Sequence, residues 1–486
     1  MDFHAHDPIE SPPTPDAADP APAELLQALA LQRRAAAECP HPDEAARRAD
    51  LLALRRFIED HESALCAAIS ADYGHRPRQE TVLTELLPVL KEIDHALAHL
   101  SSWMKVQRRR VDRMAFGLAT NRVIPQPLGV VGVIVPWNFP INLSFLPLTA
   151  IFAAGNRALV KMSEHSPRLT ALLQARIGDY FAPEKLQFFA ETGQVGVAFS
   201  RLPLDHLLFT GSTATGRRVM QAAAHNLVPV TLELGGRSPA LICEDFDLRT
   251  AAERILYVKF LNAGQICTTV DHVHVPRSQV DDFVAHARAI VPRRYPSLAS
   301  PDYTSIIHGQ AYRRLTSALD EARAMGARVV PLLPVRARDA ARHRLAPHLV
   351  LDAPADCSLM QQEIFGPILP VVAYDNLQAV IERIRSGPHP LAFYPFTHRR
   401  AVLEHLIDHV MSGGVSVNDA LFHVGQTDLP FGGVGHSGMG HYHGREGFEA
   451  FSKLRPVFQQ SRLPLTPWLA PPYGAKFEAL IRLLKR

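Results

Sequence analysis

The chain has 486 residues, and a chain of this length is expected to form two or more lobes rather than one hydrophobic core. Its hydrophobic content of 47% and charged content of 20% are typical of a globular protein, and a formal net charge of +3 provides no general attraction to nucleic acid. The cysteines form no CxxC pair, which argues against a disulfide framework and a cysteine-rich zinc site. We therefore expect a soluble protein of the reducing cytoplasm with no nucleic-acid partner.

The two ends of the chain differ in composition from the rest. Residues 1–22 are acidic and proline-rich without an apolar core, so we expect a disordered lead rather than a secretory signal. The sequence has no run of about 18 apolar residues, so we expect no transmembrane anchor. Residues 461–486 end in a short, amphipathic and basic stretch, which predicts a tail helix packed on its own protein or on a partner subunit. Binding to a membrane surface is the alternative for this helix.

The body of the chain begins with helices and then changes to an α/β pattern. Residues 23–106 are rich in Ala, Leu, Arg and Glu, with apolar residues at three- and four-residue steps, which predicts helices. Residues 107–126 are basic and then turn-like, which predicts a projecting hairpin. From residue 128 onward, continuous apolar runs alternate with helical stretches. This alternation predicts right-handed crossovers and a parallel, doubly wound sheet that is buried on both faces.

A second lobe with the same alternation is expected to begin near Gly235. The strands expected in the first lobe lie within residues 128–136, 157–163, 185–191, 206–212 and 229–236. Those expected in the second lobe lie within residues 238–245, 271–276, 327–334, 343–352, 367–375 and 414–419. The pattern therefore predicts an α/β protein with a sheet in each lobe.

Two glycine-rich segments compete as phosphate-binding turns. Residues 433–438 read Gly-Val-Gly-His-Ser-Gly, but they follow Leu-Pro-Phe instead of a strand and no βαβ unit comes after them, so we interpret them as a structural loop. Residues 209–216 do follow an expected strand and open a helix. Gly211 and Ser212 would lie at the helix N-terminus, where free N–H groups and the helix dipole favour a phosphate. The alternative for this segment is an ordinary capped turn.

Lys161 and Glu164 follow the strand expected within residues 157–163. The carboxyl end of a parallel strand faces the crevice where α/β sheets bind ligands, and these two side chains suit the hydroxyl groups of a ribose. Charged residues also commonly end buried strands, so this pair alone is weak evidence for a site.

Cys267 and Glu233 are the residues most suggestive of catalysis. Cys267 follows a Gly-Gln turn at the edge of a helical stretch, where backbone N–H groups can stabilise a thiolate. Its alternative is an inert buried thiol, which we expect for Cys66 and Cys243. Glu233 lies inside an apolar strand just before two glycines, and an apolar setting raises a carboxyl pKa, as suits a general base. The alternative is a buried carboxylate held by backbone N–H groups.

Histidine pairs are the only pattern that suggests a metal. His272 and His274 alternate along one expected strand, and His441 and His443 have the same spacing. Neither pair has a third ligand at a recognisable spacing, so we expect no metal site.

Taken together in chain order, these segments resemble the aldehyde dehydrogenase superfamily over about residues 25–460. The motifs that carry the resemblance are Pro136-Trp137-Asn138-Phe139-Pro140, Lys161-Met-Ser-Glu164, Phe209-Thr-Gly-Ser212, Leu232-Glu-Leu-Gly-Gly236, Gly264-Gln-Ile-Cys267, Glu363-Ile-Phe-Gly-Pro367 and Pro430-Phe-Gly-Gly433.

The C-terminal motifs are similar to the class 3 branch of that family. The sequences of residues 439–448 and of Ala71-Asp-Tyr-Gly-His75 are most similar to those of bacterial coniferyl aldehyde dehydrogenases. The chain departs from the family pattern at Arg237 and Met162, where lysine and proline are usual.

The resemblance implies two doubly wound parallel-sheet domains and a small oligomerisation arm. Residues 23–106 with 127–234 would form the dinucleotide-binding domain, and residues 235–449 the catalytic domain. Residues 107–126 with 450–460 would build the subunit contact of a homodimer.

The resemblance also implies the roles of the site residues. Cys267 would be the nucleophile, the Asn138 amide and the Cys267 backbone N–H would form the oxyanion hole, and Glu233 would activate water. The expected cofactor residues are Lys161 and Glu164 at the adenosine ribose, Gly211 and Ser212 at the pyrophosphate, Glu363 at the nicotinamide ribose, and Phe365 against the nicotinamide, with Trp137 as a further cofactor contact. NAD is expected before NADP, because the charge of Glu164 would repel a 2′-phosphate.

The expected reaction is the oxidation of an aldehyde to a carboxylic acid through a thiohemiacetal and a thioester on Cys267. Coniferaldehyde or another aromatic or medium-chain aldehyde is the expected substrate. One alternative is a relative that transfers the acyl group to coenzyme A, against which the presence of Glu233 argues. A second alternative is a non-catalytic scaffold, because a fold alone does not prove an activity.

Overall fold

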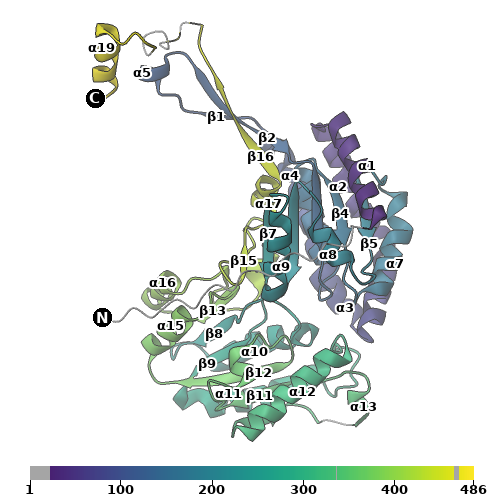
Figure 1. The fold of residues 1–486 in the computed structure, drawn as a ribbon. Coiled ribbons are helices and arrows are strands. Elements are labelled where there is room, and N and C mark those ends of the chain that lie inside the picture. Colours follow the sequence, from purple (N-terminus) through teal and green to yellow (C-terminus); the bar gives the residue numbers. More distant parts are fainter. Residues whose placement is uncertain (1–21, 335–336, 463, 465–469, 486) are drawn as a thin grey trace, which may run out of the picture.

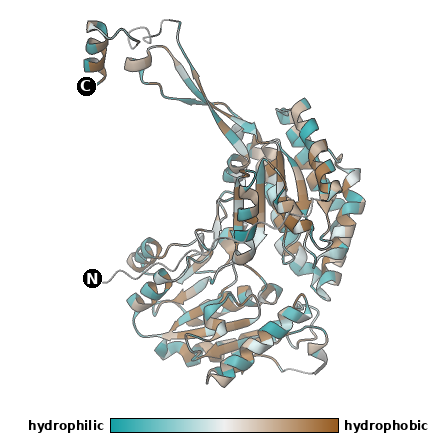
Figure 2. Ribbon diagram, in the orientation of Figure 1, coloured by the Kyte–Doolittle hydropathy of each residue, from teal (hydrophilic) through white to brown (hydrophobic). Residues whose placement is uncertain are grey.

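The computed structural model describes residues 22–334, 337–462, 464 and 470–485, which form two lobes and a projecting arm (Figure 1). The lead expected over residues 1–22 lies outside this described part except for Pro22. Hydrophobic residues concentrate in the two central sheets, and hydrophilic ones lie on the outer helices (Figure 2). The α/β fold with a sheet in each lobe is therefore confirmed.

The first lobe is built on a sheet with the strand order β15-β7-β6-β3-β4-β5. Its strands are β3 (Val130–Ile134), β4 (Arg157–Lys161), β5 (Leu186–Phe189), β6 (His206–Gly211), β7 (Val230–Leu234) and β15 (Gly438–Met439). Its helices and helical turns are α1 (Ala23–Glu38), α2 (Glu44–Tyr73), α3 (Arg78–Thr81), η1 (Val82–Leu86), α4 (Leu87–Trp103), α6 (Asn142–Ala153), α7 (Pro167–Arg176), η2 (Ile177–Asp179), α8 (Val195–Ser200), α9 (Thr213–Ala224) and α17 (Gly444–Ala450).

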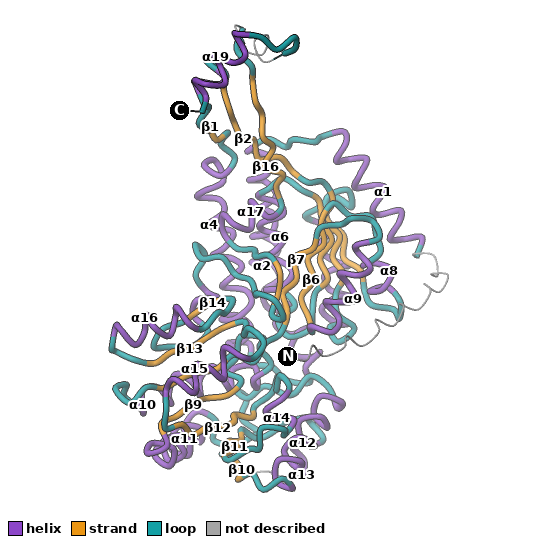
Figure 3. The backbone as a smooth tube through the Cα atoms, turned by 60° about the vertical axis from the view of Figure 1, so that its left-hand side comes forward, coloured by secondary structure: helices purple, strands orange, loops and turns teal. Residues whose placement is uncertain are grey.

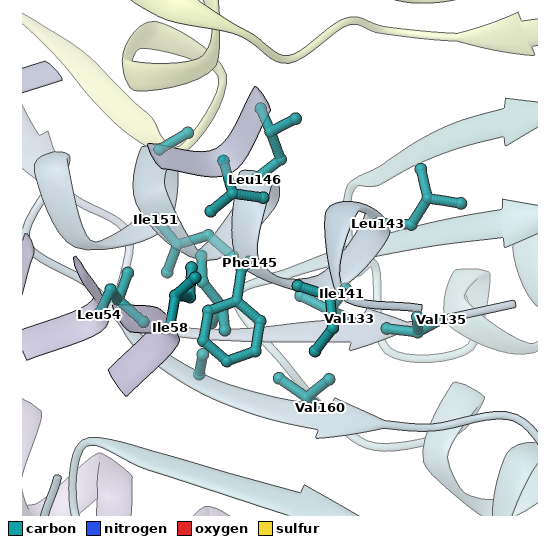
Figure 4. Packing of buried hydrophobic residues seen from close by; sticks show 14 of the residues in the cluster. Leu54, Ile58, Val133, Val135, Ile141, Leu143, Phe145, Leu146, Ile151 and Val160 are labelled. Carbon is teal, nitrogen blue, oxygen red and sulfur yellow. The ribbon is translucent and has the colours of Figure 1, made fainter. Parts of the chain in front are cut away.

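Helix α6 forms the centre of this lobe. It has 12 residues, and every one from Leu143 to Ala153 is buried, so it reads as apolar on all sides. Phe145 lies among Ile58 of α2, Val133 of β3 and Val160 of β4 (Figure 4). A helix enclosed in this way holds the loop before it, residues 136–141, in a fixed position.

The second lobe is built on a sheet with the strand order β10-β11-β12-β9-β8-β13-β14. Its strands are β8 (Pro239–Ile242), β9 (His272–Pro276), β10 (Arg328–Pro331), β11 (His348–Leu351), β12 (Ile368–Tyr374), β13 (Ala392–Phe396) and β14 (Gly414–Val415). Its helices and helical turns are α10 (Leu248–Phe260), η3 (Leu261–Gly264), η4 (Arg277–Gln279), α11 (Val280–Arg294), α12 (Gly309–Ala324), α13 (Ala337–Ala340), α14 (Ser358–Gln361), α15 (Leu377–Ser386), α16 (Arg400–His409) and η5 (Phe422–Gly425).

Both sheets are mixed at one edge, whereas the alternation of strands and helices predicts parallel sheets. β10 pairs antiparallel with β11, and β15 pairs antiparallel with β7. β13 was missed in the sequence, although proline also occurs in β10 and β12, which were expected. The run itself was the signal, since all of β13 is buried between β8 and β14.

The expected hairpin is present and forms an arm that projects from the first lobe, away from the second (Figures 1 and 3). Its sheet consists of β1 (Gln107–Arg109), β2 (Thr120–Pro127) and β16 (Ser452–Gln459), with the short helix α5 (Arg113–Phe116) at the tip. Met114, Phe116, Leu118 and Phe458 are exposed on this arm. An exposed apolar surface is typical of a protein contact, and the homodimer stays a prediction.

The tail contains the expected helix, α19 (Ala475–Leu484), within residues 461–486. This helix lies beside the far end of the arm (Figures 1 and 3). Among the described residues, no helix is both long enough and apolar enough to cross a membrane.

Asn156 joins three segments at the base of the arm. Its side chain is fully buried, and Oδ1 accepts hydrogen bonds from the backbone N–H groups of Leu128 (2.7 Å) and Gly129 (2.9 Å). Nδ2 donates to the carbonyl groups of Phe451 (2.8 Å) and Ile151 (3.3 Å). One amide therefore satisfies the backbone where β3 begins, where α6 ends and where β16 begins.

Asn156→Ala is expected to lower the free energy of unfolding by about 3 kcal/mol, because it leaves buried backbone N–H groups without partners. Urea denaturation followed by circular dichroism measures the change. Asn226→Ala is the matched control, since this exposed side chain makes a single hydrogen bond, to the carbonyl of Arg201. Equal losses in the two variants would contradict the importance of burial.

Candidate active site

Cys267 lies where the two lobes meet, just after a strained turn. Asn262, Ala263 and Gly264 have φ angles of 50°, 49° and 75°, all in the left-handed region. A Cβ atom on Gly264 would lie 2.3 Å from the carbonyl oxygen of Gly366, so only glycine fits there. Left-handed residues other than glycine store strain, and such strain clusters at functional sites. The turn therefore supports the prediction that Cys267 is a functional residue.

Gln265 fixes the same turn from inside. Its Nε2 atom donates to the carbonyl groups of Asn262 (3.0 Å) and Ser305 (3.1 Å), and its Oε1 atom accepts from the N–H of Ile307 (3.0 Å). Both the nitrogen and the oxygen of the Gln265 amide are hydrogen-bonded within the protein. The position of Cys267 is therefore held by the segment around Ser305 as well as by the turn that precedes it.

Glu233 lies in β7 and is only 2% exposed. Neither carboxyl oxygen has a hydrogen-bond partner among the described residues, and burial raises the pKa of the group well above its ordinary value. The alternative interpretation, a carboxylate held by backbone N–H groups, is therefore wrong. A buried carboxyl group without partners is costly and is suited to taking up a proton.

The Cys267 thiol is partly exposed and faces two carboxyl groups. Burial raises its pKa to about 12, and the charges of Glu363 and Glu233 act in the same direction. The resting thiol is therefore protonated at neutral pH. Cys66 and Cys243 are buried, as expected. Cys357 is also buried, in contrast to the polar loop that its sequence context suggests.

The Asn138 side chain lies against the Cys267 loop. It is 4% exposed, and its Nδ2 atom donates a long hydrogen bond of 3.4 Å to the carbonyl of Gln265. A primary amide has two N–H donors, so one donor is left for a further acceptor. This arrangement brings together Cys267, Glu233 and Asn138, the three residues predicted to be catalytic.

A narrow cavity of about 200 Å³ opens on Cys267. Most of its wall is apolar, and it includes Phe139, Leu143, Ile266, Leu421, Phe431 and His443. Such a wall disfavours water and charged groups, so the cavity suits an uncharged organic molecule whose reacting end lies at the thiol.

The residues predicted to bind the adenosine and pyrophosphate lie along the carboxyl edge of the first sheet. Ser212 is the N-cap of α9, with its hydroxyl accepting a 3.3 Å hydrogen bond from the N–H of Thr215, and Gly211 ends β6 just before it. Lys161 ends β4, whereas Glu164 is exposed in the following turn. This placement matches the expected ligand crevice of an α/β sheet.

Glu191 belongs to this edge and was missed in the sequence. Its Oε2 atom lies 2.6 Å from Nζ of Lys161, and its carboxyl group accepts hydrogen bonds from the N–H groups of Gly193, Val195 and Gly196. Lys161 therefore already has a carboxylate partner. The available signal was that Glu191 ends the run expected as a strand within residues 185–191.

Glu363, Phe365 and Trp137 lie between that edge and the thiol. The Oε1 atom of Glu363 is 3.4 Å from the N–H of Gly236, and burial raises the pKa of Glu363 to about 8. A Cβ atom on Gly235 would lie 2.0 Å from Oε2 of Glu363, so glycine makes room for the carboxyl group. Trp137 and Phe365 meet edge to face, with ring centroids 5.5 Å apart.

A cleft of about 770 Å³ extends along Glu363 to the start of α9, and Thr213, Gly235, Gly236 and Arg237 line it. Its size, its glycine-lined wall and the helix N-terminus fit an extended dinucleotide. Of the residues predicted to bind the cofactor, Glu363 lines this cleft, and Thr213 of the cleft wall directly follows Ser212.

His272 and His274, the first of the two histidine pairs, lie buried in β9. His272 Nδ1 lies 3.2 Å from Oδ2 of Asp271, which also accepts from Nε of Arg237 at 3.2 Å. The neighbouring His274 is buried without a hydrogen-bond partner. In the part of the chain that the structure describes, no three His, Cys, Asp or Glu residues are grouped to hold a metal ion.

Comparison with known proteins agrees with this geometry. The model of the aldehyde dehydrogenase family matches residues 2–457. The chain is 45% identical over 458 residues to a probable coniferyl aldehyde dehydrogenase of Pseudomonas aeruginosa, covering 94% of this chain and 95% of that protein.

Solved structures show the same fold. A substrate-bound Staphylococcus aureus AldH superposes with a TM-score of 0.89 at 33% identity, covering 95% of this chain and 99% of that one. A Mycobacterium tuberculosis aldehyde dehydrogenase complexed with NAD⁺ superposes with a TM-score of 0.80 at 26% identity, covering 91% and 90% of the two chains.

The raised pKa of Cys267 predicts how its alkylation by iodoacetamide depends on pH. Between pH 7 and 9 the rate at Cys267 is expected to rise about tenfold per pH unit without a plateau, because only the thiolate reacts. At pH 9 the Glu363 carboxyl group, with a pKa of about 8, is ionised, so Glu363→Gln is expected to increase the rate.

Mass spectrometry of peptides separates Cys267 from the exposed Cys39, and Cys267→Ser identifies the signal. A plateau below pH 8, or an unchanged rate in Glu363→Gln, would contradict the electrostatic account.

Proposed function

The chain belongs to the aldehyde dehydrogenase family, and from this premise we propose that it oxidises coniferaldehyde or another aromatic or medium-chain aldehyde with NAD. It is an NAD(P)-dependent aldehyde dehydrogenase. The observation that carries the proposal is the position of Cys267 on an apolar cavity, with Glu233, unpartnered among the described residues, acting on the thiol through its charge and the Asn138 amide bonded to the carbonyl of Gln265.

Cys267 is the proposed nucleophile. An aldehyde carbon must first gain a fourth substituent before it can lose hydride, and addition of the sulfur supplies that substituent. The proton of the thiol has to leave, and we assign it to Glu233, whose charge acts on the thiol and whose carboxyl group has no competing hydrogen bond among the described residues. Its raised pKa makes it a stronger base than an exposed carboxylate.

The oxygen of the resulting thiohemiacetal carries the developing charge. The free N–H of Asn138 and the backbone N–H of Cys267 are the proposed donors to this oxygen, and one such donor typically lowers the barrier by about 3 kcal/mol. When bound, NAD supplies the hydride acceptor. The substrate then remains on Cys267 as a thioester, which water hydrolyses with Glu233 as the base.

The choice of NAD over NADP rests on charge. Glu164 lies at the crevice edge, and Lys161 is already paired with Glu191 at 2.6 Å. A 2′-phosphate there would meet two carboxylates and only one cation, which already has a partner, so its binding would be unfavourable. The 2′-hydroxyl of NAD, in contrast, can donate to a carboxylate.

The choice of substrate rests on the cavity. Phe139 and Phe431 offer ring surfaces to an aromatic aldehyde, and the remaining wall is mostly aliphatic. A medium-chain aliphatic aldehyde also fits an apolar channel. The coenzyme A alternative is disfavoured, because such a reaction has less need of the water-activating base that Glu233 provides.

Cys267→Ser is expected to abolish NADH formation while NAD binding survives, because the hydroxyl is a far weaker nucleophile. Glu233→Gln is expected to lower kcat by about 10²- to 10⁴-fold, the usual contribution of a general base. NADH absorbance and calorimetric titration with NAD measure these effects.

In Glu233→Gln, intact-protein mass spectrometry should also detect the acyl adduct on Cys267, since its hydrolysis is slowed. Full activity of Cys267→Ser would contradict the assignment of the nucleophile. Cys66→Ser is the control, because this thiol is buried in the core of the first lobe.

The substrate proposal predicts a ranking of kcat/KM. With NAD, coniferaldehyde and benzaldehyde are expected to exceed hexanal, and Phe431→Leu is expected to reduce the preference for the aromatic substrates by removing a ring contact. NADH formation over a panel of these aldehydes, repeated with NADP and with added coenzyme A, measures the ranking. A preference for hexanal, or formation of an acyl-CoA, would contradict the finer proposal while leaving the family assignment intact.

A further inference from the structure

The backbone carbonyl of Asn138 is the focus of an unusual cluster of side chains. It accepts hydrogen bonds from the hydroxyl of Tyr73 (2.9 Å), Nη1 of Arg76 (3.2 Å) and Nδ2 of Asn262 (3.3 Å). All three donors are buried, at 2%, 1% and 0% exposure. A carbonyl oxygen has two lone pairs, so three buried donors exceed what its hydrogen-bond satisfaction requires.

The donors come from segments far apart in the sequence. Tyr73 is the last residue of α2, and Arg76 follows it after the left-handed Gly74. Asn262 belongs to the strained turn before Cys267, in the other lobe. Its Nδ2 atom also approaches the Tyr73 hydroxyl (3.2 Å) and the Gln265 carbonyl (3.1 Å). The cluster therefore ties Asn138 directly to the loop that carries the thiol.

Charge holds the cluster in place. Arg76 forms a buried ion pair with Glu85, with Nη1 and Oε1 2.6 Å apart. The other oxygen of Glu85 accepts from the N–H groups of Ile141 (2.7 Å) and Asn142 (3.3 Å), where α6 begins. The Asn138 carbonyl and the start of α6 are thus anchored to one carboxylate–guanidinium pair. Burial raises the pKa of Tyr73, so its hydroxyl stays a donor.

These contacts constrain the direction of the amide. With the carbonyl of Asn138 held by three donors, the peptide plane that follows Asn138 is fixed, and the side chain keeps only its own rotamer freedom. Its Nδ2 atom then reaches the Gln265 carbonyl at 3.4 Å and leaves one N–H aimed away from that bond. A misplacement of about 1 Å at such a donor can cost about 10²-fold in rate.

We propose that Tyr73, Arg76 and Asn262 form a positioning cluster that aims the Asn138 amide at the oxygen of the substrate. The inference rests on the proposed function, in which that amide stabilises the thiohemiacetal oxygen. The three residues are not placed at the reacting atoms, and the contact that they share is the Asn138 carbonyl. The cluster also gives a role to Tyr73 in the Ala71-Asp-Tyr-Gly-His75 motif, to which the catalytic roles assign nothing.

The test uses Tyr73→Phe in the full-length protein, because phenylalanine keeps the packing and removes only the hydroxyl. We expect kcat to fall about tenfold, with the KM for NAD, the melting temperature and the alkylation rate of Cys267 unchanged. Tyr180→Phe is the matched control, since its hydroxyl donates to Asp60 on the same helix α2, away from Asn138. This control is expected to leave kcat unchanged.

A double-mutant cycle separates positioning from a general structural effect. If Tyr73 acts through Asn138, then Asn138→Ala/Tyr73→Phe has the same kcat as Asn138→Ala, within a factor of about two. A further loss as large as that of Tyr73→Phe alone would overturn the inference, and so would an unchanged kcat in Tyr73→Phe. Arg76→Lys extends the test, because it keeps the charge opposite Glu85 and loses the planar fork.

The outcomes also separate the inference from the proposed function. If Asn138→Ala retains wild-type kcat, the oxyanion role in the proposed function fails, and the inference falls with it. If Asn138→Ala is impaired while Tyr73→Phe and Arg76→Lys are not, the proposed function stands and the positioning cluster is wrong.

Discussion

The site depends on one unfavourable interaction, the burial of the Glu233 carboxyl group inside a strand with no hydrogen-bond partner among the described residues. The neighbouring backbone packs closely against this strand. Gly438 of β15 lies opposite Glu233, and a Cβ atom there would come within 2.5 Å of the Leu232 carbonyl. The glycine-rich segment 433–438 thus lets β15 pair closely with β7, which agrees with its interpretation as a structural loop. Burial holds the pKa of the Glu233 carboxyl group well above its ordinary value, as suits a general base.

The Cys267 thiol also lies in surroundings that disfavour its charge. Burial and the charges of Glu363 and Glu233 raise its pKa to about 12, the opposite of the positive surroundings that usually activate a cysteine. A protonated thiol reacts slowly with oxidants and alkylating agents. The raised pKa therefore keeps the resting thiol protonated. In the proposed mechanism its activation depends on proton transfer to Glu233, whose charge is one of the influences that raise the pKa of Cys267.

The parts of this design that were predicted from sequence are those with a local signal. Glu233 is a charged residue inside an apolar strand, Cys267 follows a Gly-Gln turn, and Ser212 lies between a strand and a helix. The parts that were missed depend on contacts across the fold. Glu191 meets Lys161 only because β5 lies beside β4. β13 was also missed, and its apolar run contains Pro395. The antiparallel edges at β10 and β15 depend on the direction in which distant segments return to their sheets, and hydrophobic periodicity carries no information about that direction.

Hydrogen bonds across the lobes are what turn these separate residues into one site. The first lobe supplies Asn138 and Glu233, and the second supplies Cys267 and Glu363. Asn138 meets the second lobe through Gln265 and Asn262, so its position relative to the thiol is not left to the packing of two independent bodies. A slide of one lobe over the other would have to break buried hydrogen bonds first, which is costly in an apolar junction. The Asn138 side chain and the loop that carries Cys267 are therefore held together by buried hydrogen bonds, beside the cleft that Glu363 lines.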